Sequence, residues 1–223
     1  MNNEVENKIL KDIENGYDLM ADKFSGTRKH FWPGFDFILE DIKNSDKILD
    51  FGCGNGRFLE MLKGEELEYF GVDVSQKLID IAKEKYSKEG VSFQKISSSD
   101  ILPFSDNFFN SVVSISVFHH FPPGHAKAMA REIYRVTKPG GIIIISVWNL
   151  WQKKYWKYWL SPKALWKKDI IIPFRNNQGE IFNRFHYMFR KKELEKLFRN
   201  TGFQIEKSLV LNKKNIIIIG RKI

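Results

Sequence analysis

A glycine-rich turn limits what this chain can fold into. The string DFGCGNG (residues 50–56) follows an apolar, strand-like segment and precedes a segment with helical spacing, residues 57–62. Glycines at a strand-to-helix turn let the backbone approach a ligand, and the start of the helix offers unpaired N–H donors. Asp73 ends the next apolar segment, where a carboxylate can accept both hydroxyls of a ribose. The pattern predicts a nucleotide cofactor, although the string alone also suits a tight turn without a ligand.

Two common kinds of nucleotide site do not match this turn. The dinucleotide fingerprint requires a third glycine where Arg57 stands, and a side chain there obstructs close helix packing. A P-loop requires a Gly-Lys-Ser/Thr sequence at the helix start, and the chain has none. The sequence therefore disfavours both NAD binding and nucleotide hydrolysis.

Apolar strands and amphipathic helices alternate along most of the chain. The predicted strands are residues 47–52, 68–75, 91–96, 111–117, 141–148, 203–210 and 215–220. Continuous apolar strands between helices are typical of a parallel sheet covered on both faces. We expect a doubly wound α/β fold with a seven-stranded, mainly parallel sheet whose last strand is antiparallel. The third strand, VSFQKI, is expected at the edge of the sheet.

The length of 223 residues suits one domain, with an N-terminal helix over residues 4–24 and an insertion rich in Trp and Lys at about residues 148–190. The single Cys53 allows no internal disulfide and no cysteine-based zinc site, and we predict no metal. The acidic start and the absence of a run of about 18 apolar residues predict a cytoplasmic protein without a signal peptide or membrane span.

Positive charge is concentrated in the C-terminal third. The chain carries a net charge of +9, made up of −4 before Trp148 and +13 from there on. Five of the six tryptophans fall within residues 148–168, interleaved with six lysines. Aromatic rings among cations suit base stacking with phosphate neutralisation, and they also suit an interfacial membrane helix. A solvated lysine surface over inward-packed tryptophans is the third reading.

Four motifs in order resemble those of class I S-adenosylmethionine-dependent methyltransferases. They are DFGCGNG, GVDVS, SSSDILPFSDNFFNSVVSISVFHHF and KPGG, spanning roughly residues 48–148. The resemblance implies that S-adenosylmethionine is the cofactor. It also implies that the cofactor contacts Asp50, Gly52, Cys53, Gly54, Asn55, Gly56, Asp73, Val74, Asp100, Ile101 and Ser116.

The flanking strings are similar to those of the tRNA wobble-uridine carboxymethyl methyltransferases, which include the methyltransferase domain of the AlkB-like tRNA hydroxylase. They include FSGTR before WP, the IPF string and RFHYMF. The resemblance implies methylation of a carboxymethyl group on tRNA to its methyl ester, sometimes with a small zinc-ribbon activator subunit on an edge strand. Arg28 and Arg184 are the expected clamp for the carboxylate, with His119 and His186 orienting it. Adjacent strand residues face opposite ways, so only one of His119 and His120 is expected to reach the substrate.

Other functions remain open from the sequence. FPPG lacks the pattern that holds a planar amine, and Cys53 lies inside the cofactor turn, so transfer to amino groups or pyrimidine C5 is disfavoured. A small-molecule methyltransferase acting on an acid or quinone at a membrane surface is one alternative. A cofactor-binding module without catalytic activity is the other.

Overall fold

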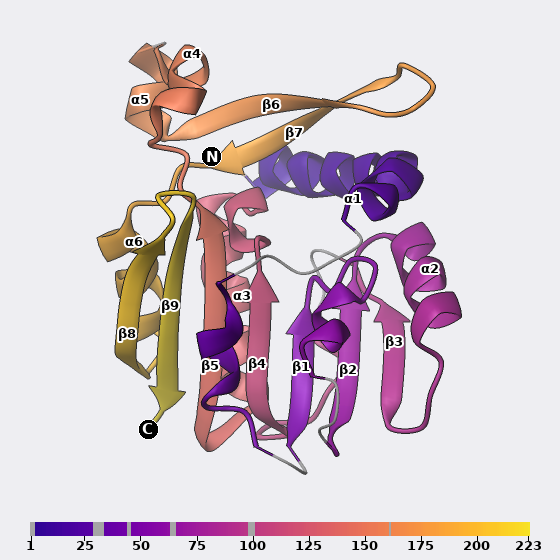
Figure 1. Cartoon of the computed structure of the whole chain (residues 1–223). Coiled ribbons are helices and arrows are strands. Elements are labelled where there is room, and N and C mark those ends of the chain that lie inside the picture. Colours follow the sequence, from indigo (N-terminus) through magenta and orange to yellow (C-terminus); the bar gives the residue numbers. More distant parts are fainter. Residues whose placement is uncertain (1–2, 29–33, 44–45, 63–65, 98–100, 161) are drawn as a thin grey trace.

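The computed structural model of the chain describes residues 3–28, 34–43, 46–62, 66–97, 101–160 and 162–223. Its centre is a seven-stranded sheet in the order β3-β2-β1-β4-β5-β9-β8, and strands β6 and β7 form a separate two-stranded ribbon (Figure 1). None of the helices within those residues is long and apolar enough to cross a membrane.

The strands of the main sheet follow the predicted alternation. They are β1 (Lys47–Phe51), β2 (Glu68–Asp73), β3 (Val91–Lys95), β4 (Phe109–Ile115), β5 (Thr137–Trp148), β8 (Phe203–Leu211) and β9 (Asn215–Lys222). The first five pair in parallel, and β9 runs antiparallel to both of its neighbours. The predicted doubly wound sheet, its antiparallel last strand and its β3 edge are confirmed.

Two apolar layers cover the two faces of the sheet. Successive residues of a strand point to opposite faces, and Ile143 and Ile144 accordingly belong to different core clusters. One layer contains the buried faces of α3 (Pro123–Val136) and α6 (Lys191–Arg199), and the other that of α2 (Gln76–Tyr86). This packing fixes the sheet and aligns the carboxyl ends of its parallel strands along one edge.

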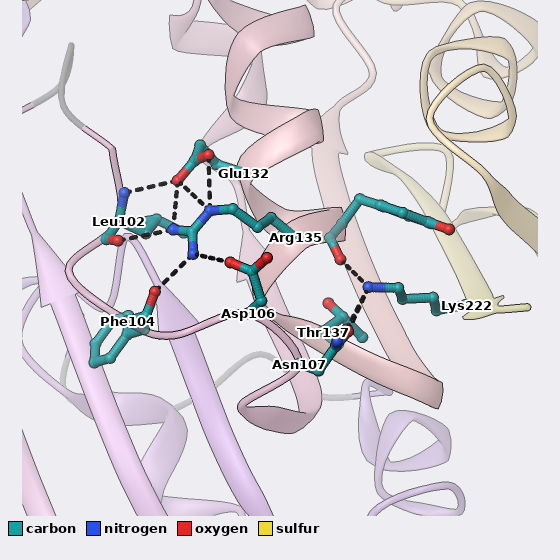
Figure 2. A network of polar contacts seen from close by, with 9 residues as sticks. Leu102, Phe104, Asp106, Asn107, Glu132, Arg135, Thr137 and Lys222 are labelled. Carbon is teal, nitrogen blue, oxygen red and sulfur yellow. Dashed lines mark hydrogen bonds and ion pairs between the residues drawn. The ribbon is translucent and has the colours of Figure 1, made fainter.

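A polar network ties the loop before β4 to the end of α3 (Figure 2). The Arg135 guanidinium donates to the carbonyl oxygens of Leu102 and Phe104, at 2.9 and 2.7 Å, and pairs with Asp106 and Glu132. The Lys222 ammonium donates to the Thr137 carbonyl oxygen at 2.8 Å. Charge-assisted hydrogen bonds of this kind are stronger than neutral ones, so they hold the loop firmly against the sheet.

The segment after the glycine-rich turn differs from its prediction. A helix was expected through Leu62, whereas the structure has a 3₁₀ helix at Arg57–Glu60. The N–H groups of Leu59, Met61 and Leu62 each donate to a carbonyl three residues back. Gly56 and Gly64 leave room for barely two helical turns, which is too short for a stable α-helix without tertiary support. Burial of Phe58 and Leu59 therefore decides the local winding.

The ribbon of β6 (Asp169–Arg175) and β7 (Ile181–Tyr187) lies inside the predicted insertion but was not itself predicted. It lies across α1 (Asn3–Gly26), above the carboxyl ends of the parallel strands (Figure 1). The contact is close, because a Cβ on Gly16 of α1 would lie 2.2 Å from the Phe182 ring. Two short helices, α4 (Trp156–Trp159) and α5 (Pro162–Lys167), precede β6. Helix α1 and the ribbon together roof the edge where the strands end.

Candidate functional site

One open cavity lies between the carboxyl ends of the strands and their roof. It measures about 1080 Å³ including its open mouth. The glycine-rich turn, the ends of β2, β4 and β5, helix α1 and strand β7 all contribute to its lining. The cavity therefore brings together segments from the start, middle and end of the chain.

The glycine-rich turn requires glycine at its first two positions. Gly52 and Gly54 have φ angles of +78° and +56°, in the left-handed region that favours glycine. A Cβ on Gly52 would lie 2.2 Å from the Val117 side chain, and one on Gly54 would lie 3.2 Å from the Phe24 ring. The N–H groups of Gly52 and Cys53 donate to the Val72 carbonyl oxygen at 2.8 and 3.0 Å. The turn thus forms a cradle of bare backbone at the cavity.

Asp73 lies opposite this turn, at the end of β2. Its carboxylate accepts hydrogen bonds from the N–H groups of Gly54, at 2.8 Å, and Ser75, at 2.9 Å. Burial raises the pKa of Asp73, while these backbone donors oppose that rise. The carboxylate lines the cavity. It is therefore held in one orientation, with lone pairs left to accept further donors.

Asp50 and Cys53 lie deeper in the same wall. The Tyr69 hydroxyl donates a hydrogen bond to the Asp50 carboxylate. Burial raises the pKa of Asp50 to about 7, despite the opposing effect of this hydrogen bond. Burial also raises the pKa of the Cys53 thiol, which the Asp50 and Asp73 charges push further in the same direction. Cys53 is therefore a neutral packing residue of the turn.

Some of the other predicted cofactor residues lie at the cavity and others do not. Gly56, Val74 and Ser116 belong to the turn or line the cavity, and Ser116 has a φ of +65°, which is rare for a residue other than glycine. The Asn55 amide donates to the Ser25 hydroxyl and the Arg28 carbonyl oxygen, at 3.1 and 3.2 Å. Ile101 is 74% exposed and is not part of the lining. Asp100 lies outside the described residues.

Arg28 and Arg184 line the same cavity although 156 positions separate them. Both guanidinium groups lie over the Phe174 ring, at 5.8 and 4.6 Å from its centroid. Arg184 also lies 5.5 Å from the Trp148 ring and is only 5% exposed. Burial lowers the pKa of Arg28, and the nearby Arg184 charge contributes to this shift. Within the described ranges, neither guanidinium has a carboxylate at ion-pair distance.

Three histidine rings cluster beside Arg184. His119 and His186 are fully buried and nearly parallel, with ring centroids 5.2 Å apart, while His120 lines the cavity. His120 accepts a hydrogen bond from the Tyr17 hydroxyl at 2.8 Å and donates to the Phe185 carbonyl oxygen at 2.9 Å. Burial lowers the pKa of His120 to about 3, and it also lowers those of His119 and His186. The cluster is neutral at physiological pH.

Comparisons with known proteins agree on the fold. Residues 49–145 match the family model described as a methyltransferase domain. A SAM-dependent methyltransferase structure from Methanosarcina mazei is 25% identical, with a TM-score of 0.70, and the match covers 87% of this chain and 99% of that one. Residues 49–145 are a class I methyltransferase domain. The cofactor of this methyltransferase domain is S-adenosylmethionine.

Two further proteins are similar to this chain. The tRNA (carboxymethyluridine(34)-5-O)-methyltransferase of Arabidopsis thaliana is 32% identical over 175 residues, covering 71% of this chain and 40% of that protein. The chain thus spans less than half the length of this curated relative. A Haloferax volcanii methyltransferase in complex with the Trm112 methyltransferase activator has a TM-score of 0.70 and 18% identity, covering 93% of this chain and 96% of its own.

The cavity of the methyltransferase domain fits this cofactor. The cradle at Gly52 and Gly54 leaves space that side chains would fill. The buried Asn55 Oδ1 and Ser116 Oγ atoms have no hydrogen-bond partner within the described part of the chain. Buried polar atoms are normally satisfied, so both atoms are available to a polar ligand. Sequence reasoning did not assign Tyr17 and Phe24 to the cavity, because their helical spacing indicates only packing.

The raised pKa of Asp50 predicts a pH-dependent stability of the methyltransferase domain. An unfolded aspartate titrates near pH 4, whereas Asp50 titrates at about 7 in the fold. Between these values the native state binds the extra proton, so the free energy of unfolding falls as pH rises from about 4 to 7. We expect Asp50→Asn to gain stability relative to the wild type over this window, measured by urea unfolding. An equal gain in the exposed Asp12→Asn control would contradict this assignment.

Proposed function

We propose that the chain methylates the carboxymethyl group of a tRNA wobble uridine, forming its methyl ester. The observation that carries the proposal is the pair of guanidinium groups, Arg28 and Arg184, facing one cavity without a carboxylate partner among the described residues. Two positive charges held together need an anion, and guanidinium groups match a carboxylate in bidentate geometry. The Arg184 guanidinium packs against the Phe174 and Trp148 rings, which help to fix its position.

A carboxylate substrate suits the chemistry of this cavity. S-adenosylmethionine, when bound, supplies a methyl group on a positively charged sulfur. A carboxylate oxygen attacks this carbon, an O–C bond forms as the C–S bond breaks, and the electron pair stays on sulfur as a neutral thioether. The nucleophile carries no proton, so no general base is needed. Alignment of the two reactants can supply roughly 7–11 kcal/mol of the barrier.

The cofactor residues have separate roles in this proposal. Asp73 accepts the ribose hydroxyls, and the backbone of Gly52, Gly54 and Gly56 lies against the cofactor. The Asp50 carboxylate, which lines the cavity at the end of β1, holds the amino group of the cofactor. This would lower the pKa of Asp50 from about 7. Cys53, Asn55, Val74 and Ser116 complete the wall.

The histidines orient Arg184 and the neighbouring aromatic residues rather than transfer protons. The backbone N–H of Trp148 donates to His119 Nδ1 at 3.3 Å. His186 donates through Nδ1 to the Arg184 carbonyl oxygen at 3.0 Å. Their lowered pKa values keep them neutral beside the two guanidinium groups. His119 therefore helps to fix Trp148, and His186 helps to fix Arg184, beside the proposed carboxylate. His120 reaches the cavity itself and positions Tyr17.

The relatives support the choice of substrate and partner. The Arabidopsis protein is named for carboxymethyluridine in tRNA, and the Haloferax structure contains an activator subunit. Strand β3 lies at the edge of the sheet, where another chain could add its backbone. We include a zinc-ribbon activator on β3 in the proposal, so assays should be run with and without such a subunit.

The test is methyl transfer from labelled S-adenosylmethionine to defined tRNAs. We expect label to enter tRNA carrying 5-carboxymethyluridine at the wobble position, and to be released by mild alkali because the product is an ester. Matched tRNA with an unmodified uridine is the control and should stay unlabelled. Transfer to small acids or quinones, with none to the modified tRNA in the presence of the activator, would overturn the proposal.

A further inference from the structure

The insertion before β6 presents an exposed face of lysines and aromatic or apolar side chains, here called the Trp/Lys face. Residues 148–168 contain six lysines and no acidic residue. The face comprises the exposed residues Lys153, Lys154, Trp156, Lys157, Leu160, Trp166 and Lys167. Trp166 is 87% exposed and Trp156 is 51% exposed. Such exposure of two indole rings is unusual for a packing residue.

The remaining aromatic residues of this insertion turn inward. Trp151, Tyr155, Tyr158 and Trp159 pack against a small core formed by Leu150, Ala164, Ile170, Ile172 and Met188. The Trp151 indole N–H also donates to the Met188 carbonyl oxygen at 3.2 Å. These contacts anchor the insertion to the ribbon, so the outward residues form a supported surface. Helices α4 and α5 lie at one end of the ribbon, on the same side of the sheet as the ribbon and α1 (Figure 1), and α1 and β7 both line the cavity.

The charges of the Trp/Lys face are uncompensated. Within the described ranges, Lys153, Lys154, Lys157 and Lys167 make no ion pair, whereas the neighbouring Lys168 pairs with Glu193. The Lys154 and Lys157 ammonium groups lie 5.3 and 5.1 Å from the Tyr155 and Tyr158 ring centroids. These rings place the two charges while leaving them open to solvent. The partner that such a face fits is a polyanion.

A membrane surface fits this face less well than a nucleic acid does. An interfacial helix inserts a continuous apolar side into the lipid. Here α4 and α5 have only four and six residues, and most of their aromatic rings are already used inside the protein. Exposed indole rings between lysines instead match single-stranded nucleic acid, where bases stack on aromatic rings and cations neutralise phosphates.

We infer that the Trp/Lys face binds the RNA substrate outside the nucleotide that enters the cavity. Lys154 and Lys157 contact phosphates, and Trp166 stacks on an unpaired base. This inference rests on the proposed function in taking RNA as the substrate. It adds a second contact region that holds the RNA at the cavity mouth.

The test measures binding of a fluorescent tRNA to the full chain by anisotropy, between about 50 and 200 mM KCl. Each lost phosphate contact lowers the slope of log affinity against log salt by about 0.7–0.9. We therefore expect the double variant Lys154→Gln, Lys157→Gln to reduce the slope by about 1.4–1.8. The matched control is Lys83→Gln, Lys88→Gln, two exposed lysines in the last turn of α2 and just after it, which should leave the slope unchanged.

Trp166→Ala separates stacking from charge. We expect it to weaken tRNA binding by about 5- to 100-fold without changing the salt slope, because stacking releases no counterions. Because Trp166 is exposed, its truncation should leave the fold intact, and unchanged S-adenosylmethionine binding serves as the check. A larger loss for the Lys83, Lys88 pair than for the Lys154, Lys157 pair would overturn the inference.

Three outcomes determine which of this inference and the proposed function stands. If the chain methylates carboxymethyluridine tRNA while all three variants bind tRNA like the wild type, the Trp/Lys face is not the RNA contact and the proposed function stands. If the variants lose binding to phosphatidylserine vesicles while tRNA binding is unchanged, the face is a membrane contact and the inference is overturned. Salt-sensitive tRNA binding through this face without any methyl transfer would contradict the proposed function alone.

Discussion

Replacing Asp73 by alanine is expected to weaken S-adenosylmethionine binding at least about 100-fold. A charged acceptor contributes about 1.5–3 kcal/mol for each hydrogen bond, and two ribose hydroxyls would lose their acceptor together. The carboxylate also holds the Gly54 and Ser75 N–H groups, so the turn loosens in the same variant. Isothermal titration calorimetry with S-adenosylmethionine measures the loss directly.

Asp18→Ala is the matched control for this prediction. Asp18 accepts a hydrogen bond from the Ser75 hydroxyl at 2.6 Å and from the Lys77 N–H at 3.2 Å, beside Asp73, but it does not line the cavity. It should therefore lower the melting temperature without a comparable loss of cofactor affinity. Equal losses of affinity in both variants would mean that Asp73 acts only by supporting the turn.

The fold could be predicted because each strand has a recognisable pattern in its own stretch of sequence. Val112, Val113 and the isoleucines of β5 are apolar in succession, which indicates a strand buried on both faces whatever it pairs with. The edge position of β3 was also predicted, because a doubly wound order leaves the third strand outermost. The short 3₁₀ helix after Gly56 was missed, since packing of Phe58 and Leu59 overrides spacing there.

The sequence indicated that the glycine-rich turn and Asp73 lie together, and the structure places both at the cavity. The glycine-rich turn and Asp73 lie within one strand–turn–strand unit, so their spacing carries the information. Arg28 and Arg184 meet only because α1 and β7 cross above the sheet. The spacing of apolar residues along the sequence does not indicate that α1 and β7 cross. Only the family resemblance pointed to Arg28 and Arg184 as a pair.

The ribbon shows where a usable signal was overlooked. The string Asn176-Asn177-Gln178-Gly179 separates two segments rich in β-branched and aromatic residues, which is typical of a hairpin. The Ile172–Arg184 pairing of this hairpin then places Arg184 beside the inward face of β6. His119 and His186 were expected at the substrate, whereas the structure places them in a buried layer behind His120. Burial of this kind depends on the ribbon and cannot be read from the FHHF string.

Replacing Arg184 by methionine is expected to lower the turnover of methyl transfer about 100-fold or more, with S-adenosylmethionine affinity unchanged. Loss of one partner from a largely buried charge pair costs about 3–5 kcal/mol, and the carboxylate of the substrate would lose half of its clamp. Methionine keeps the apolar stem between Trp148 and Phe174, so packing of the ribbon is retained. Arg28→Gln should act in the same direction, and the double variant should lose less than the sum of the two effects because both groups serve one anion.

The stability of the Arg184 variant distinguishes a substrate role from a structural one. Arg184 has no ion-pair partner in the described part of the chain and is 5% exposed, so the substrate-free fold gains little from its charge. We therefore expect the melting temperature of Arg184→Met to stay level or rise while its turnover falls. Arg175→Gln, an exposed arginine on β6 of the same ribbon, is the matched control and should change neither quantity. A fall in melting temperature that accompanies the loss of turnover in Arg184→Met, with a parallel loss of cofactor affinity, would make Arg184 a support of the roof instead of a substrate ligand.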